Sequence, residues 1–416
     1  MAFHPTRIAA ALGLAFALAA QAAPDARLKA AAEAAQPAVI ESLKQMVAIE
    51  SGSLDVAGLA KLADLTEGRL KALGFATERR KATRGAGADI VVGTLKGAGG
   101  RNILLLAHMD TVYTAGILGS QPYKQDGNRL YGPGIADDKG GIAVILHSLA
   151  ILREQGWRDF GTLTVVFNPD EEVGSLGSGE LIAELGSRHD CVLSFEPSAA
   201  KDVYKQESLL LAAAGTATAF LEVKGRASHA GAAPELGRNA LIELSHQILQ
   251  TRDVAKGVPG AQLNWTTSTG GTARNQIPEK SVAVGDVRIT AVGAEVRLLA
   301  ALQEKVASSK LVPETETSVR LEVGRPPYVA GEAGLALAKR AQAIYAELDN
   351  RPLMLVPGTG GATDAGYAGA SGKPAVMESF GLAGFGYHAR DEYIEIDSIV
   401  PRLYLTTRLL TELGRQ

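Results

Sequence analysis

The sequence has a single cysteine, Cys191, so no disulfide can form within the chain. A chain of 416 residues can be stabilised by its hydrophobic core instead. Cys191 stands in the apolar run 191–195, which is typical of core packing rather than of a nucleophile. Neither sign of charge dominates, because 42 Lys and Arg stand against 45 Asp and Glu. The net charge of −3 gives no electrostatic basis for binding nucleic acid or an anionic membrane.

Several catalytic signatures are also missing. No Gly-x-Ser-x-Gly elbow is present, so a serine hydrolase lacks its nucleophile motif. The segment 369–374 has the wrong spacing for a phosphate-binding loop. The glycine-rich segment 358–364 follows no clear strand of a nucleotide-binding fold. We interpret it as a loop of a binding cleft, with Gly360 and Gly361 as candidate substrate contacts.

The N-terminal apolar run, Ile8 to Ala20, is too short to span a bilayer. Arg7 precedes the run, and Ala20-Gln21-Ala22 has the small-x-small pattern of a cleavage site. We therefore predict that residues 1–22 are a signal peptide. The mature protein is then expected in the periplasm or outside the cell, without a membrane anchor.

The mature chain shows an α/β pattern, and its length suits two domains. Helices are predicted over 28–49 and 56–73, and a crossover helix around 142–152. Four short runs rich in Val, Ile and Leu are interpreted as buried strands of a largely parallel sheet: 90–95, 103–107, 163–167 and 192–195. After residue 332 the pattern resumes with a helix, a strand at 375–377 and a final helix over 398–413.

A different rhythm begins near Gly215. Strands are predicted at 219–223, 282–289 and 318–323, with helices at 239–251 and 294–308. The segment Gly324-Arg325-Pro326-Pro327 resembles a linker. We therefore expect residues 215–325 to form a smaller α+β domain, inserted between catalytic parts at 23–214 and 326–416.

Acidic residues and histidines follow the predicted strands. His108 ends one strand, and Asp110 at i+2 faces the same side of an extended chain, where its carboxylate can orient the imidazole. Asp137 and Asp138 lie in a Gly/Pro turn at the start of a helix, which favours a carboxylate. Taken alone, such an Asp-Asp pair is usually a helix cap.

Two further strand ends carry glutamates. Asp170, Glu171 and Glu172 follow one strand, and Glu196 follows another. Three packed anions repel one another unless cations lie among them. Because strand carboxyl ends of an open α/β sheet form the crevice where ligands bind, these groups are expected to meet there. Histidine and carboxylate ligands at such a crevice suit zinc.

The motifs, in this order, resemble those of the co-catalytic zinc metallopeptidase family that includes carboxypeptidase G (glutamate carboxypeptidase), aminoacylase and succinyl-diaminopimelate desuccinylase. The resemblance is closest to its bacterial carboxypeptidase G members and runs from about residue 36 to 413. The motifs are HMDTVY at 108, YGPGIADDKGG at 131, NPDEEVGS at 168, SFEP at 194, SHAGAAPELG at 228 and GFGYH at 384.

The resemblance implies a zinc-exopeptidase catalytic domain with an inserted dimerisation domain, and hence a homodimer. It also implies two zinc ions per subunit. His108 and Glu196 would hold one ion and Glu172 and His388 the other, with Asp137 between them. The Asp137–Asp138 peptide bond would be cis.

Roles in catalysis follow from the same resemblance. Glu171 would act as general base and Asp110 would orient His108, while His229 from a partner subunit would stabilise the oxyanion. Asn275, Arg288 and Arg325 would face the substrate. A guanidinium can hold a carboxylate at two points, which suits a substrate that ends in a free acid.

The sequence departs from the family pattern at two points. Where the resemblance implies a lysine for an acidic substrate side chain, this chain has Ser208, with Lys205 nearby. Ala362 replaces the third glycine of the cleft loop.

We therefore predict a metallohydrolase that cuts the amide bond before a C-terminal amino acid, with folate-like, N-acyl or peptide substrates. A broad dipeptidase or N-acyl-amino-acid amidohydrolase is the near alternative. A binding protein that kept the fold and lost catalysis is the alternative from another class.

Overall fold

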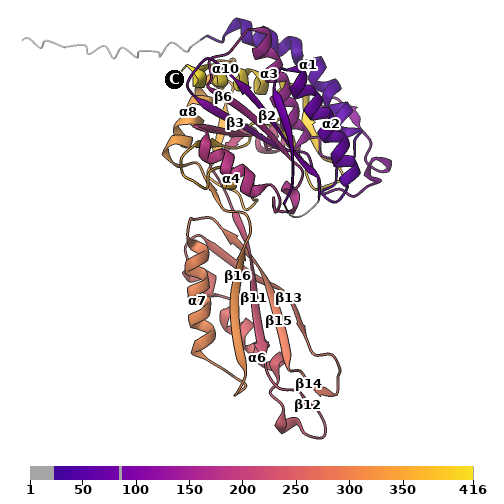
Figure 1. The fold of residues 1–416 in the computed structure, drawn as a ribbon, viewed down its shortest axis with the longest axis vertical. Helices are drawn as coiled ribbons and strands as arrows, with labels where there is room; N and C mark the ends of the chain where they lie inside the picture. Colours follow the sequence, from indigo (N-terminus) through magenta and orange to yellow (C-terminus); the bar gives the residue numbers. More distant parts are fainter. Residues whose placement is uncertain (1–22, 84–86, 416) are drawn as a thin grey trace, which may run out of the picture.

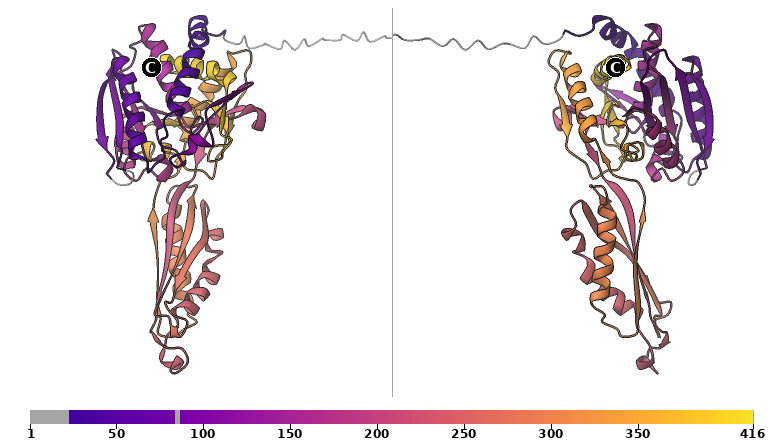
Figure 2. Two further views of the ribbon diagram at one scale, coloured as in Figure 1. Left: turned by 90° about the vertical axis from the view of Figure 1, so that its right-hand side faces the viewer. Right: turned by 60° about the vertical axis from the view of Figure 1, so that its left-hand side comes forward.

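The chain builds two parts, each around a hydrophobic core of its own (Figure 1). The computed structural model describes residues 23–83 and 87–415, so the predicted signal peptide lies outside the described residues. The larger part holds both ends of the described chain, and the smaller, elongated part projects from it (Figure 2). None of the helices in the described ranges is long and apolar enough to cross a membrane.

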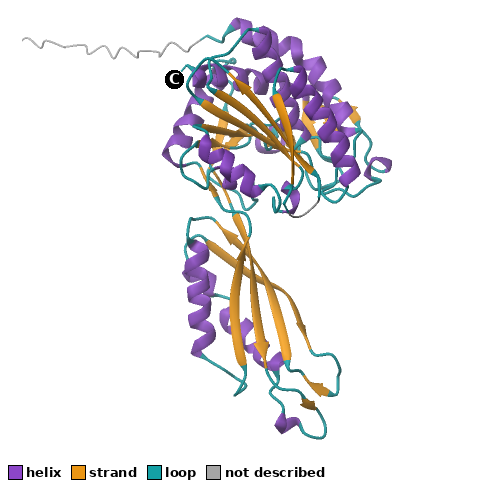
Figure 3. Cartoon of the chain, viewed as in Figure 1, coloured by secondary structure: helices purple, strands orange, loops and turns teal. Residues whose placement is uncertain are grey.

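Helices cover the sheet of the larger part (Figure 3). They are α1 (Ala26–Val47), α2 (Val56–Ala72), α3 (Lys139–Glu154), α4 (Gly179–Arg188), α5 (Lys201–Tyr204), α8 (Gly331–Ala346), α9 (Ala365–Ala368) and α10 (Ile399–Gly414). Carboxylates cap the first three of them, and Asp55 accepts a hydrogen bond from Gly58 N at the start of α2. Asp25 accepts hydrogen bonds from Arg27 N and Leu28 N, and Asp138 accepts one from Gly141 N.

The central sheet of the larger part has six strands. In spatial order they are β1 (Ala76–Lys81), β2 (Asp89–Lys96), β6 (Thr162–Asn168), β3 (Asn102–His108), β7 (Cys191–Ser194) and β19 (Ala375–Met377). The pairs β6–β3, β3–β7 and β7–β19 are parallel. The pairs β1–β2 and β2–β6 are antiparallel. This confirms the predicted α/β class.

One strand corrects the sequence analysis. The run 90–95 was predicted among the strands of a largely parallel sheet, but β2 runs antiparallel to β6. The segment 97–101 that joins β2 to β3 contains no helix, so the chain reverses direction between these two strands. A parallel pair needs a crossover of a dozen or more residues, which this connection lacks.

Smaller sheets complete the larger part. One has the order β4 (Lys124–Asp126), β5 (Arg129–Tyr131), β21 (Tyr393–Glu395), β20 (Ala383–Phe385) and β8 (Ser198–Ala199). Two others are the parallel pair β9 (Glu207–Leu210) with β18 (Leu353–Val356) and the pair β10 (Ala212–Ala213) with β17 (Tyr328–Val329). These strands are too short for a sequence period, and the sequence analysis did not predict them.

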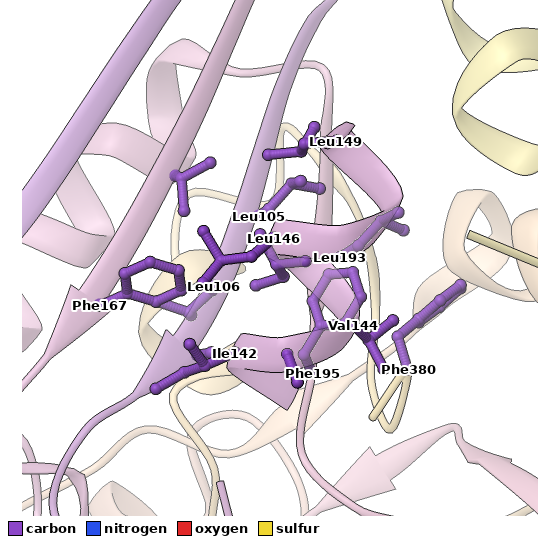
Figure 4. Close-up of a cluster of buried hydrophobic side chains, with 14 of the residues drawn as sticks. Leu105, Leu106, Ile142, Val144, Leu146, Leu149, Phe167, Leu193, Phe195 and Phe380 are labelled. Atoms are coloured by element: carbon purple, nitrogen blue, oxygen red, sulfur yellow. The ribbon is translucent and has the colours of Figure 1, made fainter. Parts of the chain in front are cut away.

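Apolar side chains fix the ends of the central strands. Leu105 and Leu106 of β3, Leu193 of β7 and Leu146 and Leu149 of α3 belong to one cluster of buried apolar side chains (Figure 4). All five are less than 5% exposed. Core packing of this density holds side chains in fixed positions, so the residues that follow these strands start from a rigid base.

The smaller part is a four-stranded antiparallel sheet with two helices. Its strands, in spatial order, are β13 (Ala261–Gly270), β15 (Lys280–Ile289), β11 (Gly215–Lys224) and β16 (Glu316–Val323). The helices α6 (Ala240–Thr251) and α7 (Ala294–Ser308) pack on it, and β12 (Ser228–His229) pairs with β14 (Gln276–Ile277). Burial alternates along β11 and β15, as expected for a sheet covered on one face.

Candidate metal centre and substrate cavity

The carboxyl ends of β3, β6 and β7 lie side by side. In the parallel register, His108 stands beside Asn168, and Leu106 stands beside Ser194. Each strand is followed within a few residues by groups singled out from the sequence: His108 and Asp110, then Glu171 and Glu172, then Glu196. The sheet therefore brings these groups to one edge, as the crevice rule for open α/β sheets predicts.

Asp110 connects His108 to the loop that carries the two glutamates. Its Oδ1 lies 3.3 Å from His108 Nδ1. Its two carboxylate oxygens accept hydrogen bonds from Glu171 N and Glu172 N, each at 3.0 Å, and Ser53 Oγ donates another at 2.7 Å. Asp110 is fully buried. The geometry fits the predicted orienting role, because one carboxylate fixes both the imidazole and the acidic loop.

Asp137 stands between two histidines. Its Oδ1 lies 2.9 Å from His108 Nε2, and its Oδ2 lies 3.3 Å from His388 Nε2. Glu196 approaches His108 Nε2 at 3.6 Å, and Glu172 approaches His388 Nε2 at 3.1 Å. The ligand atoms of His108, Glu171 and Glu196 lie within 4.8 Å of one another, as do those of Asp137, Glu172 and His388. The five predicted metal ligands therefore converge as two adjoining groups.

The chemistry of these donors fits a pair of cations. Four carboxylates meet two imidazoles here, and nitrogen with oxygen ligands suits zinc. Burial raises the pKa of Glu196 and of Glu171 well above the usual range, and burial also raises the pKa of Glu172. Such shifts show that the carboxylate charges are poorly compensated by the protein alone. A divalent cation in each group would supply the missing positive charge.

The histidines respond to the same surplus of negative charge. Hydrogen bonds to Asp137 and Glu172 raise the pKa of His388 to about 10. Burial opposes protonation of His108, but the charge of Glu196 and hydrogen bonds to Asp110 and Asp137 outweigh it and raise its pKa. The two imidazole nitrogens that face Asp137 therefore hold a proton more readily than a free histidine does. A bound metal ion would take the place of that proton.

Asp137 is held by a residue that the sequence analysis missed. The peptide bond Asp137–Asp138 is cis. Glu392 is buried and accepts hydrogen bonds from Gly134 N and Ala136 N at 2.8 Å and from Asp137 N at 3.1 Å. Burial and the nearby charge of Asp137 raise the pKa of Glu392 to about 7. Its place four residues after His388 was the one sequence signal that could have identified it.

Glu171 faces a buried arginine. Arg325 Nη1 donates a hydrogen bond to Glu171 Oε1 at 2.5 Å, and Arg325 Nη2 donates to the backbone oxygen of Glu171 at 2.5 Å. Arg325 is 5% exposed, and its Nε lies 3.5 Å from Asp364 Oδ1. The sequence analysis expected Arg325 to face the substrate. In this structure its guanidinium is engaged by Glu171 and Asp364 and forms part of the site floor.

A cavity of about 670 Å³ opens beside the metal-ligand groups. It is lined by Asp137, Glu171, Glu172, Glu196 and His388, and also by Arg288, Arg325 and Gly361. Arg288 comes from β15 of the smaller part, and its Nε donates a hydrogen bond to Asp286 at 3.0 Å. The cavity is therefore shared by both parts of the chain, and its size suits a small substrate.

Three residues that were predicted to contact the substrate do not line this cavity. Gly360 lies in the cleft loop but is not part of the lining. His229 and Asn275 lie on and beside the β12–β14 pair, at the end of the smaller part that is farthest from the central sheet (Figure 1). Asn275 O accepts a hydrogen bond from Ala230 N at 2.9 Å, and His229 is exposed. Within one chain, neither residue meets the metal-ligand groups.

Other reactive side chains have structural partners. Cys191 is buried in β7, and burial raises its pKa to about 12, so it packs in the core as predicted. His147 Nε2 lies 2.8 Å from Ser42 Oγ. His189 forms hydrogen bonds with Leu185 O and Thr164 Oγ1, and His246 forms one with Ser309 Oγ.

Comparison with known proteins agrees with this geometry. The model of peptidase family M20/M25/M40 matches residues 104–412. The chain is 46% identical to carboxypeptidase G2 from Pseudomonas sp. (strain RS-16) over 414 residues, which cover 99% of this chain and 98% of the relative. The chain belongs to peptidase family M20/M25/M40. The predicted family and the predicted hydrolase class are thereby confirmed.

A more distant relative and two solved structures extend the comparison. Succinyl-diaminopimelate desuccinylase from Novosphingobium aromaticivorans is 27% identical over 82% of this chain and 90% of its own length. Among solved structures, aminopeptidase PepT from Bacillus cereus has a TM-score of 0.72 at 20% identity, covering 91% of this chain and 98% of its own. The M20 metallo-carboxypeptidase Sso-CP2 from Sulfolobus solfataricus has a TM-score of 0.70 at 15% identity, covering 91% and 99%. These two structures share the fold. This M20 chain is thus a carboxypeptidase G2-like metallohydrolase.

Proposed function

We propose that the protein is a di-zinc exopeptidase that hydrolyses the amide bond before a C-terminal amino acid with a free α-carboxylate. The observation that carries this proposal is the position of Asp137, which directs one carboxylate oxygen to His108 and the other to His388. A carboxylate in that position can join two metal ions. When bound, the two ions would lower the pKa of a water molecule and polarise the scissile carbonyl.

Glu171 is proposed as the general base. It is buried beside the metal-ligand groups, and burial raises its pKa, which strengthens it as a proton acceptor. After taking a proton from water, it can pass that proton to the leaving amine. Arg325 holds Glu171 Oε1 and so fixes the direction of the other carboxylate oxygen. These contacts limit the base to one orientation, which supports fast proton transfer.

Arg288 is proposed to bind the substrate's α-carboxylate. Its side chain is 36% exposed and lines the cavity, whereas Arg325 is nearly buried. A guanidinium that keeps free N–H groups can donate two parallel hydrogen bonds to a carboxylate. The proposed preference for a free C-terminal acid rests on this cation. The cleft loop with Gly360 and Gly361 would close the opposite side of the substrate.

Residues 215–325 are proposed to act as a lid and dimerisation domain. His229 ends β12 and Asn275 precedes β14, and this pair lies at the end of the smaller part that is farthest from the central sheet (Figure 1). In a homodimer, the same tip of a second copy could bring its His229 to the oxyanion and its Asn275 to the substrate. Residues 1–22 are proposed to direct the protein to the periplasm and to be removed there.

The test is a hydrolysis panel with zinc-loaded enzyme. N-acyl amino acids, dipeptides and folate-type amides are compared with the same compounds blocked as C-terminal amides. We expect hydrolysis of the free acids and at least about a tenfold loss with the blocked forms, since a lost charge-assisted bidentate contact removes about 1.5–3 kcal/mol. Equal rates would remove Arg288 from the proposed role. Bound zinc without hydrolysis of any amide would leave a binding protein as the function.

A further inference from the structure

The cavity has a second wall, opposite in character to the metal-ligand groups. It is formed by Ser208 and Leu210 of β9 and by Met354 and Val356 of β18, all of which line the cavity. The two strands are parallel, with Met354 beside Ser208 and Val356 beside Leu210. Since alternate residues of a strand point to the same face, these four side chains form one continuous patch. We call them the β9–β18 wall.

The surroundings of this wall are also uncharged. Ala199 and Tyr204 line the cavity next to it. Ser208 is 6% exposed, and its Oγ accepts a hydrogen bond from Ala199 N at 3.2 Å. Three of the four wall side chains are aliphatic or a thioether. A substrate side chain that enters here loses water and gains apolar contacts, which favours carbon over charge.

The cations near the wall either pair with other groups or lie outside the cavity lining. Arg402 lies behind it, fully buried, and donates hydrogen bonds to Ser208 O at 3.2 Å and to Glu207 Oε2 at 3.1 Å. Lys201 pairs with Asp397. Lys205 is exposed and is not part of the cavity lining. A carboxylate placed against the wall would therefore find no cation among the described lining residues on this side.

The two arginines that do line the cavity serve other groups. Arg325 is bound by Glu171 and Asp364, next to the metal-ligand residues. Arg288 belongs to the smaller part and is the proposed partner of the α-carboxylate. The cavity thus has one available cation for a substrate that would carry two carboxylates if its last residue were acidic. The second carboxylate would remain buried and uncompensated.

We propose that the C-terminal residue of the substrate carries an apolar side chain, which packs on the β9–β18 wall. The enzyme then releases leucine, methionine or phenylalanine faster than glutamate. This inference rests on the proposed function, since it assigns the side chain of the residue that is released. It separates this enzyme's selectivity from its reaction type, because the wall contributes no metal ligand and no base.

The first experiment compares N-acyl amino acids that differ only at the last residue. With the zinc-loaded enzyme, we expect kcat/KM for the leucine, methionine and phenylalanine compounds to exceed that for glutamate by at least about tenfold, the lower end of what pocket contacts discriminate. Glutamate as the best substrate would overturn the proposal. The variant Lys205→Ala should leave the ratio unchanged. A glutamate preference that Lys205→Ala abolishes would assign the missing cation to Lys205 instead.

A second experiment moves a cation into the wall. Met354 is partly exposed, so the lysine of Met354→Lys can extend its ammonium group into the cavity. We expect this variant to shift the glutamate-to-leucine ratio of kcat/KM by at least about tenfold towards glutamate. Ser208→Lys should act in the same direction if the buried position accepts it. Val56→Lys, at the exposed start of α2 in the larger part, is the matched control and should leave the ratio unchanged. No shift in a folded, active Met354→Lys enzyme would remove the wall from side-chain recognition.

Binding separates this inference from the proposed function. The zinc-loaded Glu171→Gln protein is titrated calorimetrically with the same N-acyl amino acids. If the wild type hydrolyses none of them, the proposed function fails, and the calorimetric ranking still tests the wall. Tighter binding of leucine than of glutamate compounds supports the proposal, whereas equal or reversed affinities overturn it.

Discussion

The two sides of the cavity are built in different ways. On the metal-ligand side, every functional side chain has a polar partner that fixes it: Asp110 for His108, Glu392 for the turn of Asp137, and Arg325 for Glu171. On the β9–β18 wall, the side chains are mostly apolar, and the backbone ladder positions them with one polar contact, from Ala199 N to Ser208 Oγ. Reaction chemistry tolerates little displacement, whereas apolar recognition tolerates more. We therefore expect the two sides to respond differently to change.

Removal of metal should have the largest effect. Treatment with a strong chelator should abolish hydrolysis of every substrate, because the carboxylates of the site have no other means to polarise the carbonyl. Two equivalents of zinc should restore activity, measured by titration against metal content. Since the metal side is common to all substrates, the ratio of rates between leucine and glutamate compounds should stay constant during recovery. Activity that survives with no metal bound would contradict the assignment.

Glu171→Gln should lower kcat by about 10²–10⁴-fold, the range typical for a general acid–base group. The amide keeps the hydrogen bond from Arg325 but cannot take a proton from water. Metal content, measured by mass spectrometry, should remain at the wild-type level. A fall of similar size in metal binding would mean that Glu171 acts as a ligand, as its distance from His108 and Glu196 also allows.

Arg402→Met tests the support behind the wall. Arg402 is fully buried and pairs with Glu207, which is also buried. Loss of one partner of a buried pair costs about 3–5 kcal/mol. Because Arg351 still pairs with Glu207 in the variant, the free energy of unfolding should fall by the lower amount, about 3 kcal/mol. Urea denaturation measures it.

The control for this prediction is the exposed Arg320, which pairs with Glu322. Arg320→Met should change the free energy of unfolding by less than about 1 kcal/mol. If the two variants lost similar amounts of the free energy of unfolding, the buried pair behind the wall would contribute no more to stability than an exposed pair does.

Glu392→Gln should weaken metal binding by about 10–100-fold, the usual effect of removing a residue that orients a ligand. In the wild type, each carboxylate oxygen of Glu392 accepts a hydrogen bond, one from Gly134 N and the other from Ala136 N. The amide of a glutamine has one acceptor oxygen and so cannot accept both in the same way. Competition with a fluorescent zinc chelator measures the affinity. The ratio of leucine to glutamate hydrolysis at saturating zinc should not move. A changed ratio would mean that the two sides of the cavity are mechanically coupled.

His147 provides the smallest expected effect, at a site outside the cavity. Burial lowers its pKa to about 4 from 6.5. Between these values the unfolded chain binds more protons than the folded one, so this contribution to stability is present above pH 6.5 and is lost as the pH falls towards 4.

His147→Gln removes that dependence while a polar group still faces Ser42. Relative to wild type, the variant should gain about 2 kcal/mol in the free energy of unfolding between pH 7 and pH 4.5, as measured by denaturation at each pH. Activity at pH 7 should not change, because the histidine does not touch the cavity. If the difference in the free energy of unfolding between variant and wild type stayed the same from pH 7 to pH 4.5, His147 would not cause the loss of stability at low pH.

The sequence by itself determined the chemistry of the metal side. His108, Glu172 and Glu196 follow apolar strands whose parallel pairing can be inferred from composition, and parallel strands end at the same edge. The central helices and most strands of the central six-stranded sheet were predictable as well, since each carries a clear apolar period or an apolar run. Strand β13 was not predicted, because most of its side chains are exposed and its alternation of apolar and polar residues stops after Trp265.

Only the tertiary structure decided the rest of the cavity. The β9–β18 pair joins segments about 150 residues apart, and its four-residue strands hold no period that could predict their register. The pairing of Arg325 with Glu171 and the support of Asp137 by Glu392 also depend on contacts between distant segments. Local sequence fixes which side chains are available at a strand end. Long-range packing fixes which of them face one another.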